Sequence, residues 1–270
     1  IIPNKDHTED LDKCIRSIEE KGTYKNIEYI VIENNSEKKE TFAYYEKLQA
    51  ENPKVKVVFW EREFNYSAIN NYGVGFAKGE YLLFLNNDTE IINPDCIEEL
   101  LGYCMRDDVG IVGARLYYED DTIQHVGVII GLGGVAGHTF VGEPKDSLGY
   151  FGRIVTAQDY SAVTAACLMT KRKVFEKVNG FEEKLAVAFN DVDFCLKVRE
   201  AGYLVVYNPY AELHHYESKS RGLEDTEEKV LRFQGEIRTF QYRWKEILNE
   251  GDPYYSPNLT LDKTDFSLRI

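Results

Sequence analysis

The sequence predicts an α/β protein with a single doubly wound, mostly parallel sheet flanked by helices. Short apolar runs that indicate buried strands alternate with segments of helical periodicity over the first 110 residues or so. Three of these strand segments lead directly into small polar side chains, and parallel sheets bind ligands just beyond such strand ends. Hydrophobic residues make up 43% of the chain, which is enough to fill the core of one large α/β domain.

The elements of the first half follow from these two periodicities. A first strand is predicted to end at Ile1-Ile2, and three more are predicted over residues 27–32, 55–59 and 81–85. Helices are predicted between them from apolar residues at helical spacing, namely Leu11, Cys14, Ile15 and Ile18, then Phe42, Tyr45 and Leu48, and then residues 67–76. A fourth helix is expected to open at Asn93-Pro94-Asp95, with Asn93 as its cap and Pro94 in its first turn.

The second half is less periodic, and a glycine-rich stretch follows residue 130. We expect it to be either a mobile loop over a site or an irregular connection. Further on, the pattern predicts helices over residues 171–178 and 190–202, a strand over 203–207 and a long amphipathic helix over 230–247. We therefore expect one domain over 1–222, with a nucleotide-binding half (1–115) and an acceptor-binding half (116–222), and a helical tail over 223–270. The strand-like start at Ile1 suggests a segment of a longer protein.

Composition excludes several classes of function. The formal net charge of −14 argues against a general nucleic-acid binder and against broad adsorption to anionic lipid. No apolar run approaches the roughly 20 residues of a membrane-spanning helix. The five cysteines are odd in number and form no C-x-x-C pair, which favours reduced, buried thiols. We expect a cytoplasmic location, with any contact to the inner face of the membrane made through regions outside this segment.

Three strand ends carry the first candidate site residues. Polar groups follow the first, second and fourth predicted strands, as Pro3-Asn4-Lys5-Asp6, Glu33-Asn34-Asn35-Ser36 and Asn86-Asn87-Asp88. Each segment alone is more often a solvated turn. The occurrence of all three polar segments, in the order that a parallel sheet requires, is less expected by chance. A carboxylate such as Asp88 at this edge suits a hard divalent cation and the phosphates that it carries.

Asp191 is the candidate general base. Asn190 can cap the helix that it begins, and Asp193 stands where an acid completes a capping box. Two residues apart on a helix means a rotation of about 200°, so Asp191 and Asp193 cannot share a face. Asp191 is thus free to accept a proton from a substrate hydroxyl, although both acids could simply favour the helix N-terminus.

A late polar segment carries histidine, lysine and arginine. His214 and His215 follow the predicted strand and Pro209, and Lys219 and Arg221 come shortly after them. Histidine is a common metal ligand, whereas lysine and arginine bind phosphate. A histidine pair in a polar loop is more often plain surface, but its position after a strand in a chain that carries Asp88 favours a role in the site.

Together these segments resemble glycosyltransferase family 2, the inverting sugar transferases with the GT-A fold. The resemblance covers nearly the whole chain, and no single motif carries it. It includes Ile2-Pro3, the segment after Glu33, Asn70-Asn71 before 77–81, Leu85 to Asp88, Gly180-Phe181-Glu182-Glu183, and Asn190 to Leu196. The sequence looks most similar to bacterial transferases that build surface polysaccharides, whose chains share His215-Tyr216-Glu217-Ser218 and residues 252–259.

The resemblance implies roles for individual residues. Asp191 matches the catalytic base, and Asp88 and His215 match metal ligands for Mn²⁺ or Mg²⁺. The implied nucleotide-sugar contacts are Pro3, Asn4, Lys5, Glu33, Asn35, Asn70, Asn86, Asn87, Lys219 and Arg221. Two positions depart from the family's pattern, because Asn86 replaces the first acid of the Asp-x-Asp metal motif and Asn190 replaces the glutamate beside the base. The Gln-x-x-Arg-Trp motif of processive members is absent.

The implied reaction is a single displacement at the anomeric carbon of a nucleotide-diphosphate sugar. We expect a UDP- or dTDP-sugar as donor, and a glycan or lipid-linked saccharide as acceptor. Two alternatives stay open. A non-catalytic nucleotide-sugar binding module would not need Asp191. A sugar-phosphate nucleotidyltransferase would be expected to carry a glycine-rich, basic loop after the first strand, where this chain has Asn4-Lys5-Asp6-His7-Thr8.

Overall fold

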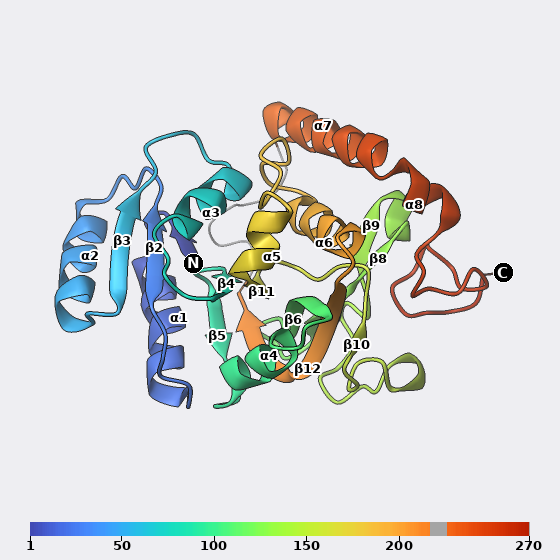
Figure 1. The fold of residues 1–270 in the computed structure, drawn as a ribbon, viewed down its shortest axis with the longest axis horizontal. Coiled ribbons are helices and arrows are strands. Elements are labelled where there is room, and N and C mark those ends of the chain that lie inside the picture. The colour runs from blue at the N-terminus through green and yellow to red at the C-terminus, as the bar shows by residue number, and fades with distance from the viewer. Residues whose placement is uncertain (217–225, 270) are drawn as a thin grey trace.

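The computed structural model describes residues 1–216 and 226–269 of the 270-residue chain (Figure 1). The first half is a parallel three-stranded sheet in the order β1-β2-β3, with three helices in the connections. Its elements are β1 (Ile2–Asn4), α1 (Thr8–Lys21), β2 (Tyr29–Glu33), α2 (Lys39–Glu51), β3 (Val55–Phe59) and α3 (Tyr66–Val74). The predicted strand over 55–59 is confirmed residue for residue.

The second half contains a mixed sheet in the order β10-β12-β6-β11-β4, with β5 paired to β12 and β7 to β6, and a separate two-stranded sheet of β8 and β9. Its elements are β4 (Tyr81–Leu85), β5 (Thr89–Ile91), α4 (Cys96–Cys104), β6 (Val109–Tyr117), β7 (Ile123–His125), β8 (Val128–Ile130), β9 (Ala136–His138), β10 (Gln158–Asp159), β11 (Cys167–Lys171), α5 (Arg172–Lys177), α6 (Asn190–Glu200) and β12 (Leu204–His215). The two sheets meet where β1 lies beside β4, because the amide of Leu85 donates to the Ile1 carbonyl at 3.1 Å.

Helices cover both faces of the sheet, as the sequence predicts. Alternate residues of β2 enter two different clusters: Val31 packs with residues of α1, α2 and α4, whereas Ile30 packs with Ile69 of α3. Farther along the sheet, Phe175 of α5 and Phe194 of α6 belong to a third cluster. The α/β class is therefore confirmed. The sheet is less parallel than expected, because β11 runs antiparallel to both β4 and β6.

Two buried strands, β6 and β11, were not predicted from the sequence. Every residue of both strands is buried, so neither shows the alternation that marks a half-exposed strand. Glycine also interrupts β6, and the packing explains it at Gly113, where an added Cβ would lie 2.5 Å from the Cβ of Val163. The expected boundary between residues 115 and 116 falls inside β6.

Three local predictions were wrong. The helix expected at Asn93 begins at Cys96, because the Asn93 amide group bonds to Asp95 and the Tyr210 carbonyl instead of capping a helix. The strand predicted over 203–207 continues to His215 as β12. Its register against β6 shifts between Asn208 and Glu212, and a bulge of this kind accommodates Pro209. His214 and His215 are therefore strand residues and do not belong to a loop after the strand.

The C-terminal segment packs back onto the domain. It contains α7 (Glu227–Arg243) and α8 (Lys245–Glu250), which meet at Trp244 where the sequence pattern predicts one continuous helix (Figure 1). Phe240 and Trp244 are buried in the largest hydrophobic cluster. All five cysteines are buried and form no disulfide. Among the described residues, no helix has the length and apolar character needed to cross a membrane.

Candidate active site

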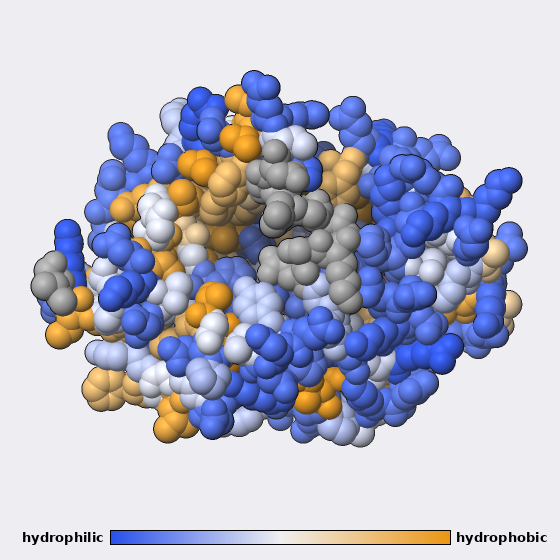
Figure 2. All heavy atoms as spheres, turned by 180° about the vertical axis from the view of Figure 1, so that it is seen from behind, coloured by the Kyte–Doolittle hydropathy of each residue, from blue (hydrophilic) through white to orange (hydrophobic). Residues whose placement is uncertain are grey.

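A cavity of about 660 Å³ lies at the carboxyl ends of β1 and β2, beside the loop after β4 and the start of α6. Its lining includes most of the residues that the sequence singled out, namely Pro3, Asn4, Lys5, Asn35, Asn86, Asn87, Asp88, Asp191 and His215. Figure 2 shows a mainly hydrophilic face of the molecule, on which hydrophobic residues gather around a recess in its upper part. The fold thus brings residues that are up to 212 positions apart, from Pro3 to His215, into one cavity.

A chain of buried hydrogen bonds joins the three strand ends. The Asn87 amide donates to Asn4 Oδ1 at 2.6 Å, and the Asn4 amide donates to the Tyr45 hydroxyl at 2.7 Å. The Tyr45 hydroxyl in turn donates to Glu33 Oε2 at 2.7 Å. Buried polar groups of this kind are stable only when their partners are in place. The chain therefore fixes the three polar segments relative to one another.

Two predicted contacts, Glu33 and Asn70, do not line this cavity. Both Glu33 oxygens are used within the protein, because Oε1 accepts from the Ser36 amide and Oε2 accepts from the Ser36 and Tyr45 hydroxyls. Only 2% of Glu33 is exposed, so in this structure it orders its own loop. Asn70 is fully buried in α3 and donates to the Tyr66 carbonyl at 2.8 Å. Lys219 and Arg221 lie outside the described residues.

Asp88 and His215 converge on one point. His215 Nε2 lies 3.2 Å from Asp88 Oδ1, since β5 pairs with the end of β12 and brings His215 opposite Thr89. His215 Nδ1 is 2.7 Å from Gln124 Oε1. An amide oxygen can only accept, so Nδ1 carries a proton and donates to Gln124. Nε2 therefore faces Asp88 Oδ1 and also the Asn86 side-chain nitrogen, which is 3.1 Å away. When Nε2 carries no proton, this nitrogen and the carboxylate oxygen that it faces form a donor pair suited to a cation.

The electrostatics of Asp88 agree with this geometry. Only 6% of Asp88 is exposed. Burial acts to raise the pKa of Asp88, but the hydrogen bond and charge interaction with His215 outweigh it and leave the pKa below its usual range. Asp88 is therefore ionised and able to bind a cation at neutral pH. Among the described residues, no group of three His, Cys, Asp or Glu side chains could hold a metal. A cation such as Mn²⁺ or Mg²⁺ at this pair would need its remaining oxygen ligands from phosphate and water.

Asp191 lies in the first turn of α6 and lines the same cavity. Its Oδ2 accepts from the Ala165 amide at 3.1 Å, and its Oδ1 accepts from the Val192 amide at 2.8 Å. Ala165 belongs to the segment before β11, and the neighbouring Ala166 carbonyl accepts from the Asn86 amide at 3.0 Å. One short backbone segment therefore contacts both the proposed base and the loop that carries Asp88.

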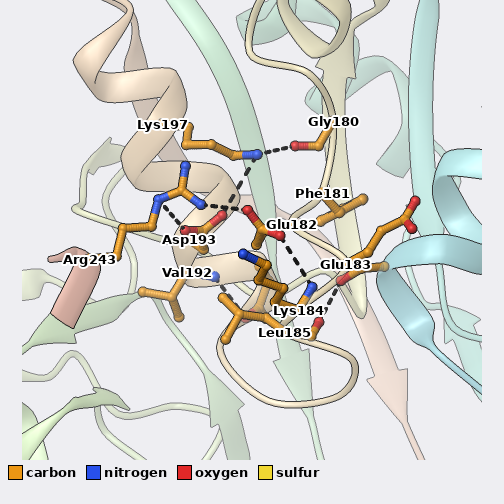
Figure 3. A network of polar contacts seen from close by, with 12 residues as sticks. Gly180, Phe181, Glu182, Glu183, Lys184, Leu185, Val192, Asp193, Lys197 and Arg243 are labelled. Atoms are coloured by element: carbon orange, nitrogen blue, oxygen red, sulfur yellow. Dashed lines mark hydrogen bonds and ion pairs between the residues drawn. The ribbon is translucent and has the colours of Figure 1, made fainter. Parts of the chain in front are cut away.

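The prediction that Asp193 completes a capping box was wrong. Its side chain is fully buried and points away from the start of α6, toward a cluster of charges that Figure 3 shows. Trp244 Nε1 donates to Asp193 Oδ1 at 2.9 Å, and Arg243 Nε lies 3.3 Å from the same oxygen. Lys197 Nζ is 3.7 Å from Oδ2. Burial raises the pKa of Asp193 despite the opposing effect of Lys197 and Arg243. Asp193 therefore joins α6 to α7.

We expect Asp193→Ala to lower the free energy of unfolding by about 3–5 kcal/mol, because it leaves the largely buried Lys197 and the Trp244 indole without their carboxylate partner. Denaturation in urea measures the loss. Asp108→Ala is the control, since it removes a carboxylate from an ion pair with Arg106 in which both side chains are more than half exposed. An equally small loss in both variants would show that the Asp193 cluster does not stabilise the fold.

Several residues that line the cavity were not predicted. They are Phe64, Tyr66, Gln124, Val128, Ala136, His138, residues 164–166, 187–190 and Val192, and Lys229, Arg232 and Phe233 of α7. Gln124 holds His215 at two points, because it also donates to the His215 carbonyl at 3.2 Å. No local pattern in the sequence marks these residues. Only the packing of β7, the 187–189 loop and α7 around the strand ends brings them together.

The predicted GT-A fold is confirmed by solved structures of similar fold, and the cavity lies at the strand ends, where a ligand was expected. A sequence model described as "Glycosyl transferase family 2" matches residues 1–178, and the chain belongs to that family. The chain is 47% identical over 99% of its length to the uncharacterized protein y4gI of Sinorhizobium fredii, of which it covers 30%. It is 37% identical over its whole length to the O-antigen biosynthesis protein RfbC of Myxococcus xanthus, of which it covers 21%.

The chain thus spans less than a third of the length of either relative. Among solved structures, a mannosyltransferase from Pyrobaculum calidifontis in complex with GDP-Man and Mn²⁺ has a TM-score of 0.62 and 15% identity. The similarity covers 92% of this chain and 66% of that one. At such low identity the likeness supports the fold alone, and the family assignment rests on the sequence match.

Proposed function

We propose that this domain transfers a sugar, with inversion, from a nucleotide-diphosphate sugar to a hydroxyl group of a growing surface glycan or a lipid-linked saccharide. The observation that carries the proposal is the presence of Asp88, His215 and Asp191 in one cavity at the strand ends. The mannosyltransferase of similar fold binds GDP-Man and Mn²⁺, and the relative RfbC is named for O-antigen biosynthesis. A nucleotide-sugar binding module would not require a carboxylate such as Asp191 at the edge of the cavity.

The donor is proposed to lie along the strand ends. Lys5 and Asn35 line the cavity and are proposed to contact the nucleoside and phosphates, with Lys5 supplying a positive charge beside Glu37. Asn4 also lines the cavity, but its amide group is bonded to Tyr45 and Asn87, so its proposed role is to order the strand end. Asp88 Oδ1 and His215 Nε2 would hold Mn²⁺ or Mg²⁺. When bound, the cation neutralises the charge that develops on the leaving diphosphate. Asn86 replaces an acid here, so the site has one carboxylate ligand among these residues and depends more on the phosphates for its affinity.

Asp191 is proposed as the general base. The Ala165 and Val192 amides each donate to a different oxygen of the carboxylate and so fix its direction. Backbone amides do not give up their protons, so the carboxylate stays unprotonated. A carboxylate held in this way can accept the proton of an acceptor hydroxyl as that oxygen attacks the anomeric carbon. A positioned base typically contributes about 10²–10⁴-fold to the rate.

A thermal-shift panel tests the proposed function. The domain is heated with UDP-, dTDP- and GDP-sugars, each with and without Mn²⁺. A ligand that binds only the folded state raises the melting temperature. We expect at least one donor to do so, and more strongly with Mn²⁺. If no nucleotide sugar shifts the transition in either condition, the proposed function is wrong.

His215 and His214 provide a matched pair for the metal site. His214 Nε2 lies 2.9 Å from Asp121 Oδ1, and His214 does not line the cavity. We expect His215→Ala to remove the Mn²⁺-dependent part of the thermal shift, and His214→Ala to leave it as in the wild type. The Mn²⁺ concentration that gives half of the shift is the quantity to compare. Equal changes in the two variants would exclude His215 as a metal ligand.

A further inference from the structure

The helix α7 contacts the chain on both sides of Asp191. On the C-terminal side, Arg243 contacts Asp193 (Figure 3). The adjoining Trp244 also donates to Asp193. On the N-terminal side, Glu236 contacts residues 187 and 188. Residues 187–189 also line the cavity. The proposed base therefore lies between two points of attachment to one helix that is about 40 residues away in the sequence.

Glu236 makes the attachment on the N-terminal side. Its Oε1 accepts from the Val187 amide at 2.8 Å, and its Oε2 accepts from the Ala188 amide at 3.2 Å. Only 3% of Glu236 is exposed. A buried carboxylate is costly unless its hydrogen bonds are made, and two backbone amides of one turn provide them. Arg232 Nε, one helical turn away, lies 3.6 Å from Oε2 and adds a positive charge.

The turn that Glu236 holds is strained at Phe189. This residue has φ 61° and ψ 6°, the left-handed conformation that bulky side chains rarely adopt. Such a conformation is unfavourable for a bulky side chain and persists only when the surrounding structure enforces it. Here the Phe189 ring stacks on Phe233, with centroids 5.8 Å apart, and packs against Phe240 at 5.4 Å. Both partners belong to α7.

We propose that Glu236 is a positioning residue for the transfer reaction. Its two hydrogen bonds fix the strained turn at residues 187–189, and that turn sets where α6 begins and where the Asp191 carboxylate points. The inference rests on the proposed function for its effect on turnover. The structural part, that Glu236 holds the turn, can be tested without any substrate.

The test compares Glu236→Gln and Glu236→Ala with Glu228→Gln. Glutamine has the shape of glutamate but directs an NH₂ group at one of the two amides, so it loses one bond, whereas alanine loses both. Glu228 is exposed in the first turn of the same helix and provides a control with the same change in charge. Hydrogen exchange is measured for the peptide that covers residues 186–192. We expect exchange to be faster in Glu236→Gln, faster still in Glu236→Ala, and unchanged in Glu228→Gln.

Turnover and nucleotide affinity are then measured separately for the donor that the thermal-shift panel selects. We expect release of the nucleoside diphosphate to slow by about 10-fold or more in Glu236→Gln, because small misplacements of catalytic groups are costly. The dissociation constant of UDP, dTDP or GDP should stay within about twofold of the wild type, since Glu236 does not line the cavity. A purely structural defect would lower binding and turnover together.

Three results would overturn the inference: unchanged exchange in Glu236→Ala, unchanged turnover in Glu236→Ala, or a parallel loss of binding and turnover in Glu236→Gln. Failure of the proposed function looks different. The wild-type domain would then bind or consume no nucleotide sugar, while the exchange measurement would still report whether Glu236 holds the turn.

Discussion

Replacement of Asp191 by asparagine is expected to lower the rate of sugar transfer by about 10²-fold or more, with nucleotide binding close to the wild-type value. Asparagine keeps the shape of the side chain and one oxygen that can accept from the Ala165 or Val192 amide. It removes the basicity that takes up the proton. Steady-state release of the nucleoside diphosphate gives the rate, and calorimetry with the free nucleotide gives the affinity.

Glu200→Gln is the control for Asp191→Asn, because Glu200 is an exposed acid at the far end of α6. It removes the same charge from the same helix and should change neither quantity. Full activity in Asp191→Asn would exclude Asp191 as the base. A loss of affinity that matches the loss of rate would indicate instead that Asp191 contributes to binding.

Replacement of Asp88 by alanine is expected to abolish the metal-dependent part of nucleotide binding. Asp88 is the proposed carboxylate ligand and faces His215 Nε2, and loss of even an outer partner of a metal ligand typically weakens binding by about 10–100-fold. Titration of UDP, dTDP and GDP with and without Mn²⁺ separates the two contributions. We expect the variant to behave with Mn²⁺ as the wild-type domain does with EDTA.

A retained thermal transition would show that Asp88→Ala folds, and the affinity measured in EDTA should be the same for variant and wild type. An Mn²⁺-dependent gain in affinity that survives in Asp88→Ala would remove Asp88 from the metal site. The His215→Ala variant would then have to be reinterpreted as well, because the two side chains form one donor pair.

The sequence predicts best where local patterns decide the structure. The strands over 55–59 and 81–85 are predicted correctly to the residue, because turns or bends flank both apolar runs. The order of strands then brings Asn4, Asn87 and Asp88 to one edge of the sheet, as expected. His215 joins them for a reason that the sequence does not show, namely that Pro209 lies in a bulge and β12 continues beyond it.

The parts that the sequence missed depend on long-range contacts. Asp193 matches a capping pattern locally, yet its partners Arg243 and Trp244 lie 50 and 51 positions away, and burial beside them decides its role. The same holds for Glu236, which is 49 positions from Val187 and resembles any other acid of an amphipathic helix. Gln124 is 91 positions from His215, and its Oε1 accepts from His215 Nδ1.

The stereochemistry of transfer tests the central claim most directly. The donor that the thermal-shift panel identifies is incubated with the wild-type domain and a simple alcohol as acceptor, so that the product is a glycoside that cannot change its anomeric form. Proton NMR then compares the anomeric configuration of the donor with that of the product. A single displacement assisted by Asp191 predicts a product of opposite configuration, and a product that retains the configuration of the donor would contradict it.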